Sequence, residues 1–477
     1  MGQDIDKSKF TAEDEKEFSA RLLSETNHLR EWFKEKRFDK SEFMCGYELE
    51  AWLVDKSGSP SPKAPEFIEK LDDKNIVPEI SMFNFEINGS PFPLGDGLLR
   101  KLEKDFSVSW DKCVEVAQKL GVTPVYIGSL PTVKEDELTL KYMSPQKRYY
   151  ALNDRVLDFR GGRPIVLDIQ GKEMLRVEHK DVMAEAAATS LQIHLGVSQD
   201  QAVKYYNASL MASPLMVALC ANSPFLYGKE LWDETRISIF EQAVNFDNIK
   251  MQGHRMEKRV TFGNGYAGGS LFDLFTENVD KYPVLLPILF DDKEDIISHL
   301  RLHNGTIWRW NRPLIGFNEE GNPHLRIEHR TPSAGPTAID MVAGMAFYLG
   351  FTHYIASLQE GPEELISFEN LKYDFYDAAK NGFNAQVHWI NGKRYNVRKL
   401  ILAVLPKVRK SLIQMGISSE EVDHYINGVI RSRLLSGQNG ANWQKQYYRN
   451  HGSCFKKMLE TYIENQSKGN PVHTWKI

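Results

Sequence analysis

Four short segments of this sequence alternate apolar residues with side chains that bind metal ions and phosphate. Successive side chains of a β-strand point to opposite faces, so each segment predicts a strand with its polar groups on one face. The segments are CGYELEAWLV (45–54), FNFEIN (83–88), SLQIHLGV (190–197) and HLRIEHR (324–330). Their polar faces carry Glu48 and Glu50; Asn84, Glu86 and Asn88; Ser190, Gln192 and His194; and His324, Arg326, Glu328 and Arg330.

The polar faces of these segments differ in composition from a solvated sheet face, which mixes Thr, Lys, Ser and Gln. They carry almost only carboxylate, imidazole, amide and guanidinium groups. Crowded carboxylates repel one another unless cations lie among them, and oxygen ligands with an occasional nitrogen suit Mg²⁺ or Mn²⁺. Any one strand alone also fits a solvated face. Together the four segments predict a divalent metal site, provided that the strands are neighbours in the sheet.

The elements that must position these groups fall into three parts along the chain. Residues 1–40 are predicted to form a helical arm, with a capping box at Thr11 and Asp14 and apolar residues at helical spacing over 11–38. Residues 41–360 mix strands and helices without a βαβ rhythm, which predicts an α+β catalytic domain. Residues 361–477 are predicted to be a helical subdomain, in which two periodic segments end at glycines.

Composition and charge exclude several classes of protein. The chain has 477 residues, 42% hydrophobic and 26% charged, with a formal net charge of −5. It lacks the basic surplus that draws a protein to nucleic acid or to an anionic membrane surface. The four cysteines form no CxxC pair, and the N-terminus is charged at once. The apolar stretch 210–226 contains two prolines and predicts a buried helix and turn. We therefore expect a cytoplasmic protein with reduced thiols.

At GYELEAWLVD, FNFEINGSP, QIHLGV, ANSPFLYG and LRIEHR, in that order, the chain resembles the glutamate–cysteine ligase family, particularly its bacterial carboxylate–amine ligase branch. That family is similar to the glutamine synthetase superfamily. The resemblance covers about residues 40–345, more loosely the tail beyond. It implies an α+β fold in which a curved antiparallel β-sheet forms a funnel flanked by helices, with a helical C-terminal region.

The resemblance also implies roles for individual residues. Glu48, Glu50, Glu86 and Glu328 match the glutamates that hold the metal ions, and Arg330 matches an arginine that neutralises the transferred phosphoryl group. Related sequences read HxHxG where this one has Gln192 and His194, so either residue is a candidate ligand. Glu79 is a further candidate, although its parity with Glu86 would place it on the opposite face of one regular strand.

Further candidates lie outside the four strands. Arg309 and Arg312, among tryptophans 308 and 310, suit nucleotide contact, and Arg326 is assigned to the same task. A packed aromatic strand with surface arginines is the alternative. Arg236 and Arg148 are candidates for holding a substrate carboxylate. The resemblance makes Asn222, in ANSPFLYG, part of the substrate wall.

No phosphate-binding loop accounts for nucleotide binding. The motif GxxxxGK[ST] is absent, and GxGxxG at Gly263, Gly265 and Gly268 lacks the surrounding βαβ unit, so we expect a loop at the mouth of the site. Phosphate handling then falls to metal ions and arginines.

The expected reaction is phosphoryl transfer from ATP to the γ-carboxylate of glutamate, followed by attack of an amine on the γ-glutamyl phosphate. The cofactor is Mg²⁺ or Mn²⁺, and cysteine is the first candidate amine. Three alternatives stay open: a ligase for another amine, a metal-dependent hydrolase built on the same carboxylates, and a protein that binds metal or nucleotide without catalysis. A homodimer is also open.

Overall fold

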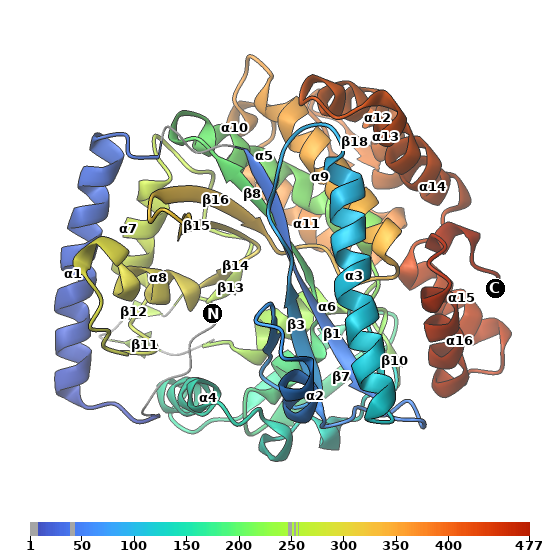
Figure 1. Cartoon of the computed structure of the whole chain (residues 1–477), viewed down its shortest axis with the longest axis horizontal. Coiled ribbons are helices and arrows are strands. Elements are labelled where there is room, and N and C mark those ends of the chain that lie inside the picture. Colours follow the sequence, from blue (N-terminus) through green and yellow to red (C-terminus); the bar gives the residue numbers. More distant parts are fainter. Residues whose placement is uncertain (1–7, 39–42, 247–249, 252–253, 256) are drawn as a thin grey trace.

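The computed structural model describes residues 8–38, 43–246, 250–251, 254–255 and 257–477. Its centre is an antiparallel sheet with the strand order β15-β16-β8-β1-β3-β2, to which β4 and β5 add by pairing with β1. The sheet curls, so that β15 and β16 run across the direction of β1 and β3 (Figure 1). The strands are β1 (Met44–Val54), β2 (Ile76–Pro78), β3 (Asn84–Asn88), β4 (Phe92–Pro93), β5 (Thr123–Val125), β8 (Leu191–Val197), β15 (Asn311–Phe317) and β16 (Pro323–His329). The predicted α+β fold with a curved antiparallel sheet is confirmed.

The register of the sheet brings the four predicted polar faces together on one side. Glu50 of β1 lies opposite Glu86 of β3. Glu48 lies opposite Gln192 of β8. His194 of β8 lies opposite Glu328 of β16. Residues directly opposite in an antiparallel pair share a face, so these side chains form one continuous polar surface.

The other face of the sheet is apolar and is covered by helices. Leu49, Ile193 and Ile327 are almost fully buried there. Helix α5 (Gln199–Cys220) contacts β8, β15 and β16, and packs on α9 (Ala338–Ala356). The apolar stretch predicted as a buried helix lies in α5, which contains Pro214 and is buried from Tyr205 to its end. No helix of the described residues is long and apolar enough to cross a membrane.

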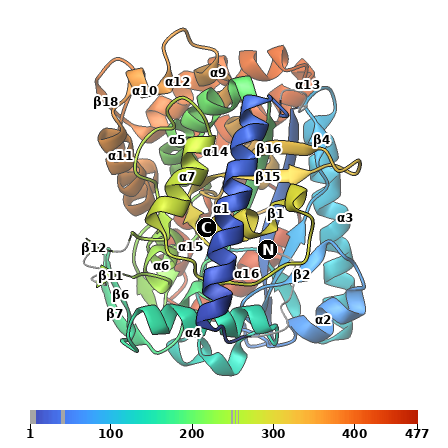
Figure 2. The same ribbon diagram turned by 90° about the vertical axis from the view of Figure 1, so that its left-hand side faces the viewer.

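The predicted N-terminal helix is α1 (Ala12–Lys34), and it begins with the predicted capping box of Thr11 and Asp14. It lies along the outer side of α7 (Phe272–Lys281) and α8 (Ser298–Gly305), as Figure 2 shows. Its buried Glu25 accepts from the backbone N–H of Leu300 at 2.8 Å and contacts His299 Nδ1 at 2.5 Å. The arm is therefore fixed to the helix that precedes β15.

Beyond residue 360 the chain is mostly helical, as predicted, and forms one flank of the molecule (Figure 1). The two segments expected to end at glycines do so, with Gly416 and Gly437 at positive φ. The second is not purely α-helical, because Asp423–Arg431 form a π-helix. The helices are α10 (Pro362–Leu365), α11 (Phe368–Asn381), α12 (Val397–Gln414), α13 (Ser419–Val422), α14 (Ser432–Ser436), α15 (Gly440–Asn450) and α16 (Phe455–Ser467). The boundaries at 40 and 360 stay predictions.

The remaining elements surround the sheet, and α2 and α3 cover part of its apolar face, where Phe67 packs on Phe85 and Phe106 stacks on Tyr47. Helix α3 packs against α9 and β5, and the hairpin of β6 and β7 packs against α6. The predicted glycine loop at 263–268 is irregular. It follows β13, which pairs in parallel with β14 beyond α7 and α8, so the prediction that no βαβ crossover surrounds the loop is not confirmed. These elements are α2 (Ala64–Leu71), α3 (Leu98–Lys119), α4 (Lys147–Phe159), β6 (Ile165–Gln170), β7 (Met174–His179), the 3-10 helix η3 (Met183–Ala187), α6 (Thr235–Ala243), β13 (Val260–Thr261) and β14 (Trp308–Arg309).

A buried ion pair joins the C-terminal helices to α9. Arg433 donates to Asp340 Oδ1 at 2.7 Å, and Asp340 also accepts from the N–H of Val472. We expect Arg433→Ala to lower the free energy of unfolding by about 3–5 kcal/mol, because it leaves a buried carboxylate without its cation. The exposed pair of Arg409 and Asp423 is the control, and Arg409→Ala should leave the thermal midpoint almost unchanged, because solvent screens this pair. Thermal unfolding followed by circular dichroism checks both, and equal effects would contradict the prediction.

Candidate active site

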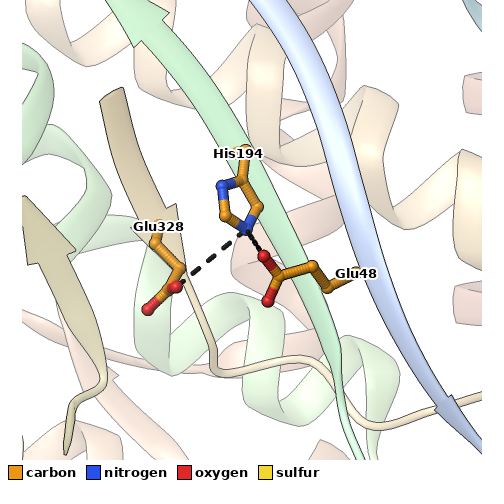
Figure 3. A group of neighbouring side chains, drawn as sticks. All are labelled: Glu48, His194 and Glu328. Carbon is orange, nitrogen blue, oxygen red and sulfur yellow. Dashed lines mark ion pairs between the residues drawn. The ribbon is translucent and has the colours of Figure 1, made fainter. Parts of the chain in front are cut away.

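Glu48, His194 and Glu328 converge from β1, β8 and β16 (Figure 3). The His194 Nε2 atom lies 3.3 Å from Glu48 Oε1 and 4.0 Å from Glu328 Oε1. This nitrogen is buried and has no hydrogen-bond partner among the described residues. A buried polar atom aimed at two carboxylates, with no partner of its own, is the arrangement expected of a metal ligand.

A second carboxylate group, made of Glu50, Glu79 and Glu86, lies beside the first on the polar face. Burial and the negative charge of Glu79 raise the pKa of Glu50 to about 7. The pKa of Glu86 is raised well above its ordinary value by burial and then by the charges of Glu48 and Glu79. Burial also raises the pKa of Glu79. These carboxylates repel one another, and cations between them would relieve the repulsion.

The parity argument against Glu79 was wrong. Glu79 follows the separate strand β2, in which Val77 lies opposite Glu86, so the chain turns between Glu79 and Glu86. Sequence reasoning also missed Glu185 on η3, whose pKa is raised well above its ordinary value by burial and then by Glu79 and Glu50. Its only signal was a lone carboxylate in the apolar run MAEAAA.

The two groups of side chains fit divalent metal ions. Glu48, Glu328 and the buried nitrogen of His194 supply two oxygens and one nitrogen, with the ligand atoms within 4.8 Å of one another. Carboxylate oxygens with one imidazole suit Mg²⁺ or Mn²⁺. Burial would raise the pKa of Glu48, but His194 outweighs it and brings the pKa to about 2. Glu48 is therefore ionised at neutral pH and ready to bind a cation.

The structure favours His194 over Gln192 as the metal ligand, because both ends of the Gln192 amide are engaged. Its nitrogen donates to Glu50 Oε1 at 3.0 Å, and its oxygen accepts from Arg330 Nη1. Gln192 thus bridges a carboxylate and the arginine proposed for phosphoryl transfer.

Arg330 follows β16 directly and reaches the metal-binding face. Its Nη1 donates to Glu328 Oε2 at 3.1 Å as well as to Gln192. Its Nε is buried without a partner in the described part of the chain. The pKa of Arg330 is raised, because Glu328, Glu50 and Glu48 outweigh the burial that would lower it. Arg330 is therefore a fixed cation whose Nε can still donate a hydrogen bond.

Arg312 shares the face of Glu328, but the structure does not support its assignment to ATP. Its Nε and Nη2 donate to the two oxygens of Glu328 at 2.9 and 3.0 Å, and its Nη1 donates to the carbonyl of Gly305. All three nitrogens are therefore occupied within the protein. Although burial opposes it, Arg312 together with Arg330 holds the pKa of Glu328 well below its usual range. Arg312 keeps this metal-binding carboxylate ionised and oriented.

Arg309 is also placed away from the predicted role in ATP binding. Its buried guanidinium donates to Glu277 Oε2 and Asn278 Oδ1, both at 3.0 Å. The neighbouring Trp308 and Trp310 are buried and pack on Phe240. The packed aromatic strand of the alternative is therefore present, but its arginines are buried and do not lie on the surface. Neither tryptophan offers an exposed ring on which a base could stack.

The predicted substrate residue Asn222 is fully buried and makes structural contacts. Its side chain donates to Ala334 and Tyr462 and accepts from Gln444, so it ties the C-terminal helices to the catalytic part. This placement contradicts a direct contact with substrate. No local sequence pattern indicates these contacts of Asn222, because its hydrogen-bond partners lie more than 100 residues away along the chain.

Arg236 and Arg148 both lie near the second carboxylate group. Arg236 Nε pairs with Glu234 at 2.9 Å, and its Nη2 donates to the carbonyl of Thr331 at 2.6 Å. Because both nitrogens are engaged within the protein, a bidentate contact with a substrate carboxylate is not available. Its Nη1 makes no hydrogen bond to a described residue. Arg148 donates to the carbonyl of Pro78, next to Glu79, and its charge acts on that carboxylate. Their substrate roles stay predictions.

The sequence matches a known family over most of its length. The model of the family described as glutamate-cysteine ligase family 2 (GCS2) matches residues 44–460. The chain belongs to this family. As a member it is an ATP-dependent carboxylate–amine ligase, and the family uses ATP with a divalent metal ion. A putative glutamate–cysteine ligase 2 of Gloeobacter violaceus is 22% identical over 416 residues, covering 84% of this chain and 91% of that protein.

Two solved structures show the same fold. The glutamate–cysteine ligase of Francisella tularensis, in complex with AMP, is 10% identical with a TM-score of 0.53, covering 92% of this chain and 90% of that one. A bifunctional glutathione synthetase from Pasteurella multocida is 12% identical with a TM-score of 0.50, covering 92% of this chain and 54% of that one. At these identities the likeness concerns the fold alone.

The geometry predicts that Glu86 lowers the free energy of unfolding of the metal-free enzyme, whereas Glu328 raises it. Glu86→Gln should raise the free energy of unfolding of the metal-free enzyme by about 0.2–1 kcal/mol, because it removes a repelled charge. Glu328→Gln should lower it by about 3 kcal/mol, because it leaves the guanidinium groups of Arg312 and Arg330 without their carboxylate. Both should lose Mg²⁺-induced stabilisation. Calorimetry in chelator and in Mg²⁺ checks this, and equal signs for the two variants would contradict it.

The raised pKa of Glu50 predicts a pH dependence in the metal-free enzyme. The folded protein holds this proton more tightly than the unfolded chain, whose carboxyl has an ordinary pKa of 4.5. Its stabilising contribution is complete below pH 4.5 and is lost as the pH rises to about 7. We expect the thermal midpoint in chelator to fall over this window and Glu50→Gln to flatten the fall. An unchanged slope in that variant would contradict the prediction.

Proposed function

We propose that this ligase joins the γ-carboxylate of glutamate to the amine of cysteine through a γ-glutamyl phosphate intermediate. The observation that carries the proposal is the convergence of Glu48, His194 and Glu328 beside the second carboxylate group, with Arg330 on the same face. The match of family and fold supports the reaction class. Cysteine as the acceptor is supported by the name of the Gloeobacter violaceus relative.

The reaction proceeds in two steps. In the first step, a γ-carboxylate oxygen of glutamate attacks the terminal phosphorus of ATP, and the bond to the ADP oxygen breaks. The glutamates and His194 would hold divalent ions, which would neutralise charge on the phosphates. Arg330 lies on the same face as a preorganised cation, and its unoccupied donors would stabilise the moving phosphoryl group. Gln192 and Glu328 fix its orientation.

In the second step, the amine nitrogen attacks the carbonyl carbon of γ-glutamyl phosphate. Phosphate leaves with the bridging oxygen, and the nitrogen loses a proton as the amide forms. No protein nucleophile is required, which fits the burial of Cys45, Cys113 and Cys220 and the exposed surface position of Cys454. Burial also raises the pKa of Cys45 to about 12, so its thiol is protonated and unreactive.

The direct test of this proposal is an acceptor screen. We expect purified enzyme with ATP, Mg²⁺ and glutamate to release phosphate fastest with cysteine among a panel of amines, and mass spectrometry to find γ-glutamylcysteine. Faster phosphate release with another amine would mean that this amine, and not cysteine, is the acceptor, while the ligase reaction would stand. Phosphate release without any amine, or cleavage of an amide substrate without ATP, would favour a hydrolase.

Arg330→Gln tests the role assigned to the fixed cation. We expect kcat to fall by about 10²–10³, because one preorganised charge is removed from the transition state, while the KM for ATP changes little. The control is Arg309→Gln, which removes a guanidinium that is more deeply buried than that of Arg330 and is paired with Glu277 instead of Glu328. Mg²⁺-induced stabilisation should persist in Arg330→Gln. An unchanged kcat in a folded variant would remove Arg330 from the mechanism.

A further inference from the structure

A group of polar side chains lies in the apolar layer beneath the active site, at the end of β16. His329 and Thr331 flank Arg330 in the sequence but lie on the opposite face from it, and Asn311 of β15 lies beside His329. All three side chains are fully buried. Burying polar groups costs free energy unless each one finds a hydrogen-bond partner. These groups interrupt a face that otherwise carries residues such as Ile193, which lies opposite His329 on β8.

The hydrogen bonds of this polar group run in one direction. Ser213 on α5 donates its hydroxyl proton to the carbonyl of Ser209 at 2.9 Å, so its oxygen must accept from Asn311 Nδ2 at 2.8 Å. The Oδ1 atom of Asn311 is therefore turned to His329, whose Nδ1 donates to it at 2.7 Å. His329 Nε2 is then the acceptor for the hydroxyl of Thr331, also at 2.7 Å. We call this series of bonds from Ser213 to Thr331 the His329 network.

The imidazole of His329 is neutral and is held in one orientation. Burial, and then the charge of Arg236, lower its pKa to about 3. Its ring stacks on Tyr348 of α9, with the ring centroids 4.4 Å apart and the planes inclined by 18°. Both ring nitrogens have partners, so another ring orientation would leave a buried polar atom unpaired. The His329 network therefore joins the ends of β15 and β16 to α5 and α9.

The main chain around Arg330 is fixed on both sides. The N–H of Arg330 donates to the carbonyl of Trp310 at 2.9 Å. Arg236 Nη2 donates to the carbonyl of Arg330 at 3.3 Å and to that of Thr331 at 2.6 Å. The bond from the Thr331 hydroxyl to His329 holds the next residue of the chain from beneath. These contacts set the direction in which the Arg330 side chain leaves the backbone.

We propose that the His329 network positions Arg330 for phosphoryl transfer. It holds the backbone from which the guanidinium reaches Gln192 and Glu328, and so it sets where this cation meets the transferred phosphoryl group. The inference rests on the role of Arg330 in the proposed function. A preorganised charge stabilises the transition state only if it is held in place, and a misplacement of about 1 Å can cost about 100-fold in rate. Such positioning accounts for fully bonded polar groups in an apolar layer.

Thr331→Val tests the proposal, because valine has the shape of threonine but cannot donate to His329. Hydroxylamine serves as the acceptor, since its nitrogen attacks the carbonyl carbon of γ-glutamyl phosphate and phosphate leaves. We expect kcat for hydroxamate formation to fall about tenfold, with the KM for ATP changed less than about twofold, and Thr331→Ser to restore kcat. The matched control is Thr352→Val on α9, which removes an equally buried hydroxyl that donates to carbonyls of its own helix. It should keep the parent kcat.

Arg330→Gln as a background separates positioning from a general loss of structure. If the His329 network acts through Arg330, Thr331→Val lowers kcat in the parent but has no further effect in the Arg330→Gln enzyme. An equal loss in both backgrounds would overturn the proposal, as would an unchanged kcat in a folded Thr331→Val enzyme. If Thr331→Val does not fold, Ser213→Ala at the other end of the network takes its place in the same comparison.

Crystal structures of the variants distinguish failure of this inference from failure of the proposed function. The guanidinium of Arg330 should leave Gln192 and Glu328 in Thr331→Val and stay in place in Thr352→Val. If the parent enzyme forms no hydroxamate, the proposed reaction fails, and these structures alone decide whether the network positions Arg330. An Arg330 side chain that keeps both contacts in Thr331→Val would overturn the inference even in an active enzyme.

Discussion

Electrostatic repulsion among carboxylates on one face of a sheet is the constraint on which this structure depends. Glu50 and Glu86 face each other across β1 and β3, and Glu79 comes to the same place from β2. Repulsion on a polar face of this kind is relieved by cations or, in their absence, by protonation, as the raised pKa of Glu50 reflects. The helices that bury the opposite face hold the strands in register, so the carboxylates cannot move apart in the absence of metal.

The cations that the protein itself supplies are distributed unevenly over this face. Glu328 is bound by both Arg312 and Arg330, so its pKa is lowered, although burial alone would raise it. Among the described residues, Glu50 accepts hydrogen bonds from Ser190 and Gln192 alone, and burial raises its pKa. At the β16 end of the face, Glu328 is therefore ionised and held by arginines. At the β1 end, Glu50 has no such arginine pair, and added metal ions would have to neutralise it.

The sequence predicted the faces of the strands well but not the partners of the side chains. Period two in CGYELEAWLV and HLRIEHR fixes which residues share a face, because alternation is a local property of the backbone. It does not fix register, so the opposition of Glu50 and Glu86 had to come from the structure. Asn222 was misassigned for a similar reason, since Tyr462 and Gln444 lie far along the chain.

The arginines show that residue type alone does not decide which side chain contacts the nucleotide. Arg309, Arg312 and Arg326 are equivalent as sequence candidates for nucleotide contact, because each follows or precedes strand residues of the site. In the structure, these arginines differ in whether a carboxylate pairs with the guanidinium group. Arg309 and Arg312 are both bound to carboxylates, and all three guanidinium nitrogens of Arg312 donate hydrogen bonds within the protein. Residue type and neighbouring aromatic residues therefore do not reveal which guanidinium groups are already paired within the protein.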